Sequence, residues 1–303
     1  MHASAPPIAP WRIWLLAARP ATLPASVAPV LVGTAAAVGV GGLDAPLREG
    51  AFIAALVAAL LLQIGTNFAN DLFDFERGAD NEGRLGPTRA THAGWVTPSQ
   101  MRTAAALTFA AAVVLGIYLI VLAGWPVVVA GVAAVIAGIA YTGGPWPYGY
   151  HGLGDLFVFI FFGIVAAMGS FFVQVEHLTW EAFAVALPGA FTVTAILIVN
   201  NLRDVDTDRR SGKHTLAVIL GAQVARAQFH AFLVAPFLLV IVFAATDLLP
   251  WWSMLSWVAL PLAALVAYRV ARGAAGHALN IVLKQTGQLH LVFGVLLAIS
   301  FLL

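Results

Sequence analysis

Residues 67–80, NFANDLFDFERGAD, place polar side chains at helical spacing directly after an apolar run. Asn67, Asp71 and Asp74 stand at positions i, i+4 and i+7, which fall within an arc of about 60° on an α-helix. Asp80 follows in a polar loop. Carboxylate and amide oxygens on one face are ligands that a hard divalent cation takes. A single motif of this kind is also common where a helix meets the lipid headgroups, so it needs support from elsewhere in the chain.

A second stretch, residues 200–221 with the sequence NNLRDVDTDRRSGKHTLAVILG, repeats the arrangement. Asn201, Asp204 and Asp208 stand at i, i+3 and i+7, again within an arc of about 60°, whereas Asp206 points roughly the other way. An even number of expected membrane crossings separates the two stretches, so both reach the same side of the membrane. We expect the two polar faces to meet at the mouth of a helix bundle.

Four carboxylates gathered in this way would be unstable alone, because like charges repel and burial penalises the charged forms. A divalent cation removes this cost. Oxygen ligands without His or Cys favour Mg²⁺, which commonly takes one or two carboxylates, waters and substrate phosphates. The predicted metal ligands, direct or through water, are Asn67, Asp71, Asp74, Asp204, Asp208 and Asn201.

Basic residues follow both acidic stretches, and guanidinium and ammonium groups are suited to phosphate oxygens. We therefore predict that Mg²⁺ holds a diphosphate whose apolar tail lies among the helices. The predicted diphosphate contacts are Arg77, Arg84, Arg89, Arg203 and Lys213. Arg209 and Arg210 are the basic residues whose presence is most easily explained by the orientation of the chain in the membrane alone. Gln63, about one turn before Asn67, is expected to hydrogen-bond within the cavity.

The elements that carry these residues are predicted to be membrane-spanning helices. The 303-residue chain is 61% hydrophobic and 10% charged, with a mean hydropathy of +0.92, whereas soluble domains carry about 25% charged residues. A span needs about 20 apolar residues. The candidate spans are residues 20–41, 51–74, 101–122, 126–143, 153–173, 181–201, 227–246, 251–271 and 285–303. We expect an all-α polytopic membrane protein with about nine transmembrane helices and a single domain over residues 1–303.

Local signals refine this expectation. The first span contains Pro20, Pro24 and Pro29, so its start should be kinked or irregular. An amphipathic piece over residues 215–226 is expected before the seventh span. The chain has no cysteine, which excludes disulfides and thiolate chemistry, and it has no basic stripe that would indicate nucleic-acid binding.

The basic residues predict the orientation in the membrane. With a cytoplasmic N-terminus, 14 of the 15 Lys and Arg residues fall on the cytoplasmic side, and Arg48 falls on the other. Such an excess is typical of cytoplasmic loops. Both acidic stretches, and the polar loops at about 75–98 and 202–214, are therefore expected to face the cytoplasm.

Four stretches of the chain resemble the UbiA-type superfamily of intramembrane aromatic prenyltransferases. They are RPATLPASVAPVLVGTA (19–35), NFANDLFDFERGAD with RLGPTRAT (67–80 and 84–91), YTGGPWPYGYHGLGDLFVFIFFG (141–163) and NNLRDVDTDRRSGKHTLAVILG (200–221). The two Asp-rich motifs are shared across the superfamily. The GPTRAT loop and the YTGGP…GLGD run resemble its 1,4-dihydroxy-2-naphthoate polyprenyltransferase branch, as does the spacing of six residues between Asp74 and Asp80.

The resemblance implies a UbiA-like helix bundle that transfers a polyprenyl group from polyprenyl diphosphate to 1,4-dihydroxy-2-naphthoate, with loss of CO₂ and diphosphate, in menaquinone biosynthesis. It also implies Mg²⁺ dependence and a place in the bacterial inner membrane. In such a reaction the metal and fixed cations stabilise the departing diphosphate. The residues expected to be catalytic are Asp71, Asp74, Asp204, Asp208, Lys213 and Asp155.

Two residues are candidates for the chemistry of the acceptor and of the allylic cation. Asp155, in GLGD, is either a base that takes a hydroxyl proton from the acceptor or an ordinary acid at the start of a helix. Tyr141 is either a ring face that shields the cation or one of the many aromatic residues that serve packing.

Two other functions fit parts of the sequence. Intramembrane acids also mark the ion pathway of a cation-coupled transporter, but they then lie near the middle of the bilayer, beside broken helices. The acids here lie at helix ends next to basic loops, which favours a diphosphate enzyme. Within the enzyme class, the acceptor could be a different aromatic compound, such as 4-hydroxybenzoate or homogentisate.

Overall fold

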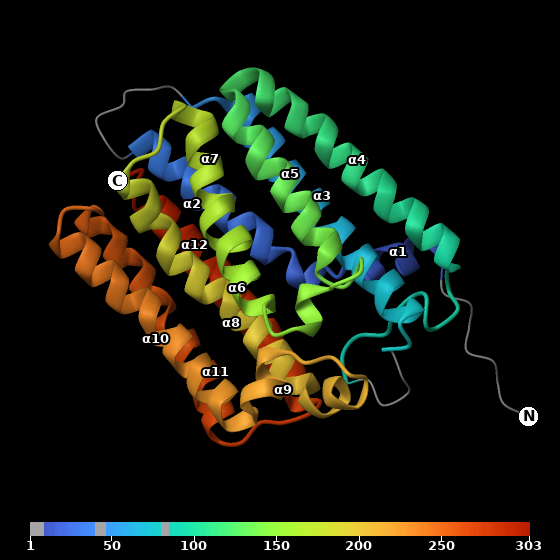
Figure 1. The fold of residues 1–303 in the computed structure, drawn as a ribbon. Helices are drawn as coiled ribbons and strands as arrows, with labels where there is room; N and C mark the ends of the chain where they lie inside the picture. Colours follow the sequence, from blue (N-terminus) through green and yellow to red (C-terminus); the bar gives the residue numbers. More distant parts are fainter. Residues whose placement is uncertain (1–8, 40–46, 80–84) are drawn as a thin grey trace, which may run out of the picture.

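The computed structural model describes residues 9–39, 47–79 and 85–303, and this part of the chain contains helices and no strand (Figure 1). The expected all-α fold is therefore confirmed. The α-helices are α1 (Pro10–Ala18), α2 (Pro24–Gly39), α3 (Glu49–Glu76), α4 (Pro98–Ala123), α5 (Trp125–Ala140), α6 (Gly154–Val158), α7 (Ala166–Val175), α8 (Trp180–Arg210), α9 (Leu216–Leu220), α10 (Ala222–Ala245), α11 (Leu260–Ala271) and α12 (Ala278–Ile299). Three short 3-10 helices are η1 (Pro20–Thr22), η2 (Tyr148–Tyr150) and η4 (Trp251–Ala259), and the π-helix η3 (Phe159–Val165) joins α6 to α7.

Membrane-spanning helices make up most of the fold. Seven helical segments in the described ranges are long and apolar enough to cross a membrane, and the bent pair Pro10–Thr22 and Pro24–Gly39 would make an eighth. The remaining expected span is α5, whose 16 residues extend about 24 Å, less than a hydrocarbon core of about 30 Å. The expected number of about nine spans therefore holds as an approximation, with α5 as a short member.

The predicted irregularity of the first span is a bend of 54° between α1–η1 and α2. Pro20 begins η1 and Pro24 begins α2, at positions where the missing backbone N–H costs little. Pro29 lies inside α2. The piece expected over 215–226 is divided, because Gly221, with a φ of +85°, separates α9 from α10.

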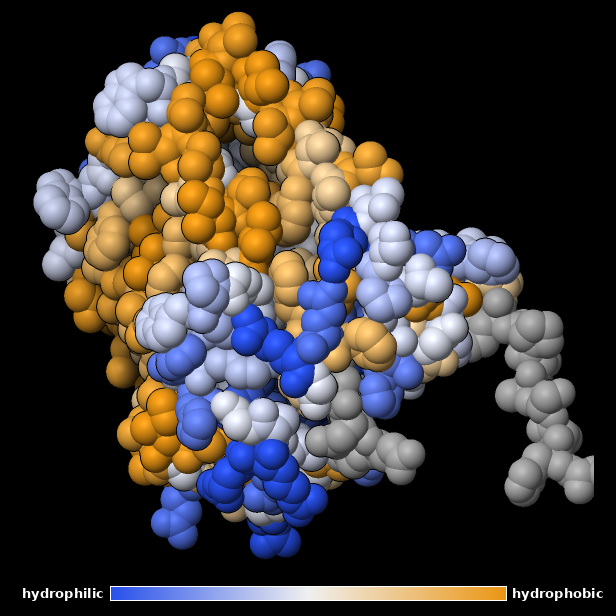
Figure 2. All heavy atoms as spheres, turned by 45° about the vertical axis from the view of Figure 1, so that its right-hand side comes forward, coloured by the Kyte–Doolittle hydropathy of each residue, from blue (hydrophilic) through white to orange (hydrophobic). Residues whose placement is uncertain are grey.

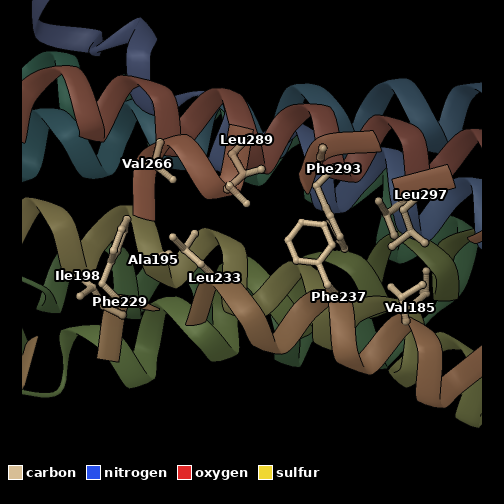
Figure 3. Packing of buried hydrophobic residues seen from close by; sticks show 14 of the residues in the cluster. Val185, Ala195, Ile198, Phe229, Leu233, Phe237, Val266, Leu289, Phe293 and Leu297 are labelled. Atoms are coloured by element: carbon tan, nitrogen blue, oxygen red, sulfur yellow. The ribbon is translucent and has the colours of Figure 1, made fainter. Parts of the chain in front are cut away.

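The most extensive core surrounds α8. About 72% of the most apolar stretch of α8 is buried. The corresponding share is 22–50% for the other described helices that are long and apolar enough to span a membrane. Figure 3 shows the packing of this core. Its residues include Val185, Ala195, Ile198, Phe229, Leu233, Phe237, Val266, Leu289, Phe293 and Leu297. The buried position of α8 fixes the place where its polar C-terminal turns emerge.

Small residues allow close helix contacts, which is the usual basis of helix association in lipid. Gly33 of α2 lies against the backbone of α7, so that an added Cβ would lie 2.0 Å from the carbonyl oxygen of Ala167. We expect Gly33→Ala to force the helices apart and to lower the free energy of unfolding by about 1–3 kcal/mol. Thermal unfolding in detergent measures this loss. Gly169→Ala is the matched control, because a Cβ there meets nothing within 4 Å, and equal destabilisation by both changes would contradict the prediction.

A large apolar cavity lies between α3, α4 and α5 on one side and η3–α7 on the other. Its volume is about 770 Å³, and its lining includes Leu62, Val135, Phe161 and Met168. Gln63, the residue after Leu62, is buried. In Figure 2, hydrophobic residues cover most of the upper part of the molecule and hydrophilic residues concentrate in the lower half. The cavity is lined by apolar side chains and glycines, with Ser170 as the one polar side chain among the described lining residues.

Candidate active site

Asp71 is buried near the C-terminal end of α3, with 1% of its surface exposed. Its two carboxylate oxygens accept hydrogen bonds from the backbone N–H groups of Ala90 (2.9 Å) and Thr91 (3.0 Å). These bonds stabilise the ionised carboxylate and also attach the loop over residues 85–91 to α3. The predicted polar face of this helix is therefore directed into the protein.

Asp74, one turn later, is held by two side chains from distant parts of the chain. Arg89 donates a hydrogen bond of 2.6 Å to one carboxylate oxygen, and the Tyr150 hydroxyl donates one of 2.8 Å to the other. The Arg89 and Asp74 side chains are 5% and 3% exposed. This is a buried ion pair between two residues that the sequence assigned to different ligands, the metal and the diphosphate.

The second acidic stretch contains a similar pair. Arg203 of α8 binds both carboxylate oxygens of Asp204, at 2.8 Å and 2.5 Å. The same guanidinium donates to the side-chain oxygens of Asn200 and, on α12, Asn280. Asp206 points away from this network and is exposed. The helical arc predicted from the sequence therefore separates the buried acids from the exposed one.

The loop over residues 85–91 connects the two acidic stretches. Besides the contacts of Arg89, Ala90 and Thr91 with α3, its carbonyl at Leu85 accepts a hydrogen bond of 2.9 Å from Asn280. Gly86 lies so close to Arg203 that an added Cβ would be 2.8 Å from its guanidinium. The loop thus joins the C-terminal end of α3 to α8 and α12.

Two tyrosines lie between the stretches. Tyr141 directly follows α5 and is half-buried, and the Tyr150 hydroxyl donates to Asp74. The Lys213 ammonium nitrogen lies 5.7 Å from the centroid of the Tyr141 ring and 5.3 Å from that of Tyr150. Asp74 and Lys213 therefore lie beside the same tyrosine, Tyr150, at one end of the bundle.

Arg77 approaches the same tyrosine from the first stretch, with its guanidinium carbon 5.6 Å from the centroid of the Tyr150 ring. It also donates hydrogen bonds to the carbonyl oxygens of Thr142 (3.0 Å) and Gly144 (2.5 Å). Arg77 therefore supports the turn that carries Tyr141, in addition to lying beside the acids.

The three amides with predicted roles make specific protein contacts. Asn201 donates to Asp155 at 3.2 Å, and Gln228 of α10 donates to the other oxygen of Asp155 at 3.0 Å. Gln63 and Asn67 donate to the bend between α1 and α2. Asp80 and Arg84, which the sequence also singled out, lie outside the described residues.

The sequence profile of the UbiA prenyltransferase family matches residues 26–302. The chain belongs to this family. It is 38% identical over 286 residues to 1,4-dihydroxy-2-naphthoate octaprenyltransferase of Mycobacterium tuberculosis, covering 94% of this chain and 95% of that protein. It is 35% identical to the protein of the same name from Escherichia coli, over 90% and 89% of the two chains.

Solved structures of UbiA homologues share the fold. The structure of an Archaeoglobus fulgidus homologue bound to GPP and Mg²⁺ aligns with a TM-score of 0.68 and 14% identity, over 96% of this chain and all of that chain. The apo structure of a homologue from Aeropyrum pernix aligns with the same TM-score and 15% identity, over 98% of both chains. The prenyltransferase fold is thus retained at low sequence identity.

One expectation about the site of this prenyltransferase needs correction. The acids do not gather into one cluster, because among the described residues no three His, Asp or Glu side chains form a group placed to hold one metal ion. The physical reason is that buried carboxylates have local partners: Asp71 has backbone N–H groups, Asp74 has Arg89 and Asp204 has Arg203. These partners offset the repulsion that was expected to require a shared cation.

The donor set nevertheless fits Mg²⁺. A carboxylate has about four lone-pair sites, so an oxygen with one hydrogen bond keeps capacity for a cation. Mg²⁺ is usually bound by one or two carboxylates and completed by waters and substrate phosphates. The two stretches therefore suit two partial sites rather than one complete protein cage.

Sequence analysis missed three residues that build the site: Tyr150, Gln228 and Asn280. Tyr150 lies just before GLGD, within a stretch that carries the resemblance to the prenyltransferase family. This position in the sequence could have marked it as a candidate site residue. Gln228 and Asn280 are polar residues in or next to apolar segments, and intramembrane polar residues are generally functional or paired. Their partners are 73 and 77 residues away in sequence, beyond the reach of any local pattern.

Tyr150→Phe tests the contact between the two stretches. Removing a hydrogen bond to a charged group costs about 1.5–3 kcal/mol, so we expect kcat/KM for prenyl transfer to fall by about 10- to 100-fold. Tyr148→Phe is the control, because the Tyr148 hydroxyl donates to the Ala137 carbonyl and not to an acid. Kinetics of the two purified variants decide the question, and equal losses would show that the effect is only structural.

Proposed function

We propose that this chain is a Mg²⁺-dependent 1,4-dihydroxy-2-naphthoate polyprenyltransferase. It transfers a polyprenyl group from polyprenyl diphosphate to 1,4-dihydroxy-2-naphthoate, releases diphosphate and CO₂, and yields demethylmenaquinol, the reduced form of demethylmenaquinone, for menaquinone biosynthesis. The observation that carries the proposal is that Asp74 of the first acidic stretch and Lys213 of the second both contact Tyr150, Asp74 through a hydrogen bond of 2.8 Å and Lys213 with its ammonium 5.3 Å from the ring centroid. Bacterial relatives with this activity in their names match nearly the whole chain, and we treat residues 1–303 as one transmembrane prenyltransferase domain.

The donor diphosphate is expected to bind between the two stretches. Asp71 and Asp74, with Asn67, would hold Mg²⁺ from one side, and Asp204 and Asp208, with Asn201, from the other. The bound metal supplies charge neutralisation to the leaving diphosphate. Each pair of carboxylates would need only waters and phosphate oxygens to complete an octahedral shell.

The basic side chains of the site are the remaining phosphate contacts. Lys213 and Arg77 flank Tyr150, so they can stabilise the negative charge that develops as the allylic C–O bond breaks. Arg89 and Arg203 hold Asp74 and Asp204 in place, and their positive charges lie beside the proposed diphosphate site. Arg84 completes the proposed set.

The apolar cavity between α3, α4, α5 and α7 suits the polyprenyl tail. Its volume of about 770 Å³ is within the range of ligand pockets, about 300–1,000 Å³. Among its lining residues on α3, Leu62 is the nearest in sequence to Asp74, about three turns before it. A donor with its diphosphate at the acids would thus place its tail toward this apolar space.

The acceptor chemistry needs a base and a dry environment. Asp155, buried and held by Asn201 and Gln228, can accept a hydroxyl proton from the naphthoate. The acceptor ring carbon then forms the new C–C bond, while the electrons of the C–O bond leave with diphosphate. Loss of CO₂ from the same ring carbon returns its electron pair to the ring. The Tyr141 ring face would shield the allylic cation.

We also propose that the protein lies in the bacterial inner membrane, with its N-terminus and active-site loops in the cytoplasm. The distribution of Lys and Arg supports this orientation. The variant Arg210→Cys of this cysteine-free chain should react with an impermeant thiol reagent in inverted but not in right-side-out vesicles.

The function is tested with purified protein in liposomes, geranylgeranyl diphosphate and 1,4-dihydroxy-2-naphthoate, with Mg²⁺ or with EDTA. We expect Mg²⁺-dependent formation of a demethylmenaquinol, which is recovered as demethylmenaquinone after oxidation by air, and release of CO₂. Prenylation of 4-hydroxybenzoate in its place would retain the prenyltransferase and reject the proposed acceptor. No product with any aromatic acceptor, from folded protein, would reject the function and favour a transporter.

A further inference from the structure

One side chain of α12, Asn280, lies between the two acidic stretches. Its amide oxygen accepts a hydrogen bond of 2.9 Å from Arg203, and its amide nitrogen donates one of 2.9 Å to the carbonyl oxygen of Leu85. Asn280 is half-buried in the first turn of α12. A single amide thus joins α8 to the loop over residues 85–91, and both of its polar atoms are used.

The bond to Arg203 connects the second acidic stretch to another helix. The other hydrogen bonds of this guanidinium, to Asp204 and Asn200, stay within α8. Within the described part of the chain, Asn280 is therefore the one hydrogen-bonding partner of the Arg203 side chain from a different element. Arg203 binds both oxygens of Asp204, so Asn280 also restrains that carboxylate.

The bond to Leu85 leads to the first acidic stretch. Through residues 89–91, the same loop binds both buried acids of α3, Asp71 and Asp74. The loop is therefore fixed to α3 at one end and to α8 and α12 at the other. A displacement of α12 would be passed to both acidic stretches at once.

Gly86 brings the loop directly onto Arg203. An added Cβ at this glycine would lie 2.8 Å from a guanidinium nitrogen. The Arg203 side chain is 1% exposed and is held by the hydrogen bonds to Asp204, Asn200 and Asn280, so it cannot move aside without breaking one of them. Gly86, Arg203 and Asn280 thus form one junction between the loop and the two helices.

We propose that Asn280 is a positioning residue that fixes the spacing of the two acidic stretches, so that one Mg²⁺–diphosphate complex contacts both. Through Arg203 it holds Asp204, and through the loop over residues 85–91 it holds the first stretch. The proposal rests on the proposed function, because it needs the donor to bind between the stretches. Each stretch is only a partial metal site, and a displacement of about 1 Å far from the chemistry can lower a rate about 10²-fold.

Two variants disturb the junction from opposite sides. Asn280→Leu keeps a side chain of similar size and removes both hydrogen bonds, whereas Gly86→Ala pushes the loop away from the guanidinium. Thr286→Val is the matched control, because Thr286 is buried in the same helix and its hydroxyl donates to the Val282 carbonyl, within α12. Any general weakening of α12 should appear in the control as well.

Hydrogen exchange in the protein without metal or donor tests the junction itself. The amides of Ala90 and Thr91 are bonded to Asp71, at the far end of the loop from the junction. We expect Asn280→Leu and Gly86→Ala to speed the exchange of these two amides about tenfold, and Thr286→Val to leave it unchanged. Unchanged exchange in Asn280→Leu would overturn the proposal, whatever reaction the protein catalyses.

Steady-state kinetics separate positioning from loss of folded protein. Asn280→Leu and Gly86→Ala should each raise KM for geranylgeranyl diphosphate about tenfold, with little change in KM for the naphthoate. Because both act on one junction, the double variant should raise the donor KM little further than the stronger single variant. Additive losses, or a lower melting temperature with an unchanged donor KM, would overturn the proposal.

A binding measurement keeps the test independent of the acceptor. Inorganic diphosphate with Mg²⁺ should raise the melting temperature of the wild-type protein and of Thr286→Val, and should raise that of Asn280→Leu and Gly86→Ala much less. This result would support the proposal even if the naphthoate were not the acceptor. Equal stabilisation of all four proteins would overturn the proposal while leaving the transfer assay to judge the function.

Discussion

Asp71→Asn and Asp204→Asn should each lower prenyl transfer by about 10²- to 10³-fold or more, the loss expected when one electrostatic contact with a developing charge is removed. Each substitution weakens the binding of the proposed Mg²⁺, whose positive charge would stabilise the departing diphosphate. Steady-state kinetics with saturating Mg²⁺ give the size of the effect. The loss should appear mainly in kcat, because the charge is most needed as the C–O bond breaks.

The structure also predicts that Asp71→Asn loses stability, and this loss must be measured together with the kinetics. Asp71 accepts a backbone N–H at each carboxylate oxygen, and asparagine can accept only one of them. We expect Asp71→Asn to cost about 1–3 kcal/mol of stability through the unpaired N–H group. Thermal unfolding of each variant shows whether enough folded enzyme remains for the kinetic comparison.

Asp206→Asn is the matched control for both variants. Its side chain is 74% exposed and contacts only Arg209 among the described residues, at 3.5 Å. It lies two residues from Asp204 on the opposite side of α8, so transfer should stay near the wild-type rate. An equally inactive Asp206→Asn variant, or a fully active Asp204→Asn variant, would refute the assignment of the buried face to the donor site.

The helices and their buried faces follow from the sequence because local spacing determines them. Hydrophobic length predicted the spans, and the 3.6-residue period predicted that Asp204 and Asp208 share a face from which Asp206 points away. Asp204 is buried, Asp208 is half-buried and Asp206 is exposed. Both acidic stretches remain helical past the apolar part of their spans, to Glu76 and Arg210. A regular period carries this information without any knowledge of the tertiary fold.

The partners of the acids could not be predicted in the same way. Asp74 meets Arg89 and Tyr150 because a loop and a short 3-10 helix fold back over the end of α3, and no periodic pattern encodes such an approach. Counting the acids alone therefore suggested a cluster that needs a shared metal. The backbone N–H groups at Asp71 have no signature in the sequence at all, since every residue except proline carries one.

Arg89→Gln should be among the most destabilising single substitutions at this site. It leaves the Asp74 carboxylate, 3% exposed, without its buried cation, and breaking such a pair by removing one partner typically costs about 3–5 kcal/mol. The variant should melt well below the wild-type protein. Its loop over residues 85–91 should be held less tightly against α3, which faster hydrogen exchange in that loop would detect. Arg209→Gln is the control, because the exposed pair of Arg209 with Asp206 contributes at most about 1 kcal/mol.

The double variant Arg89→Met with Asp74→Leu separates the structural part of this pair from its chemical part. A buried ion pair replaced by apolar side chains of similar volume is often as stable as the original, so the double variant should recover most of the melting temperature that Arg89→Gln loses. It should still be inactive, because Asp74 is proposed to hold Mg²⁺ and no apolar residue can do so. Recovery of transfer along with stability would show that the pair serves only the fold, and the metal would then have to be held by Asp71 and the second acidic stretch.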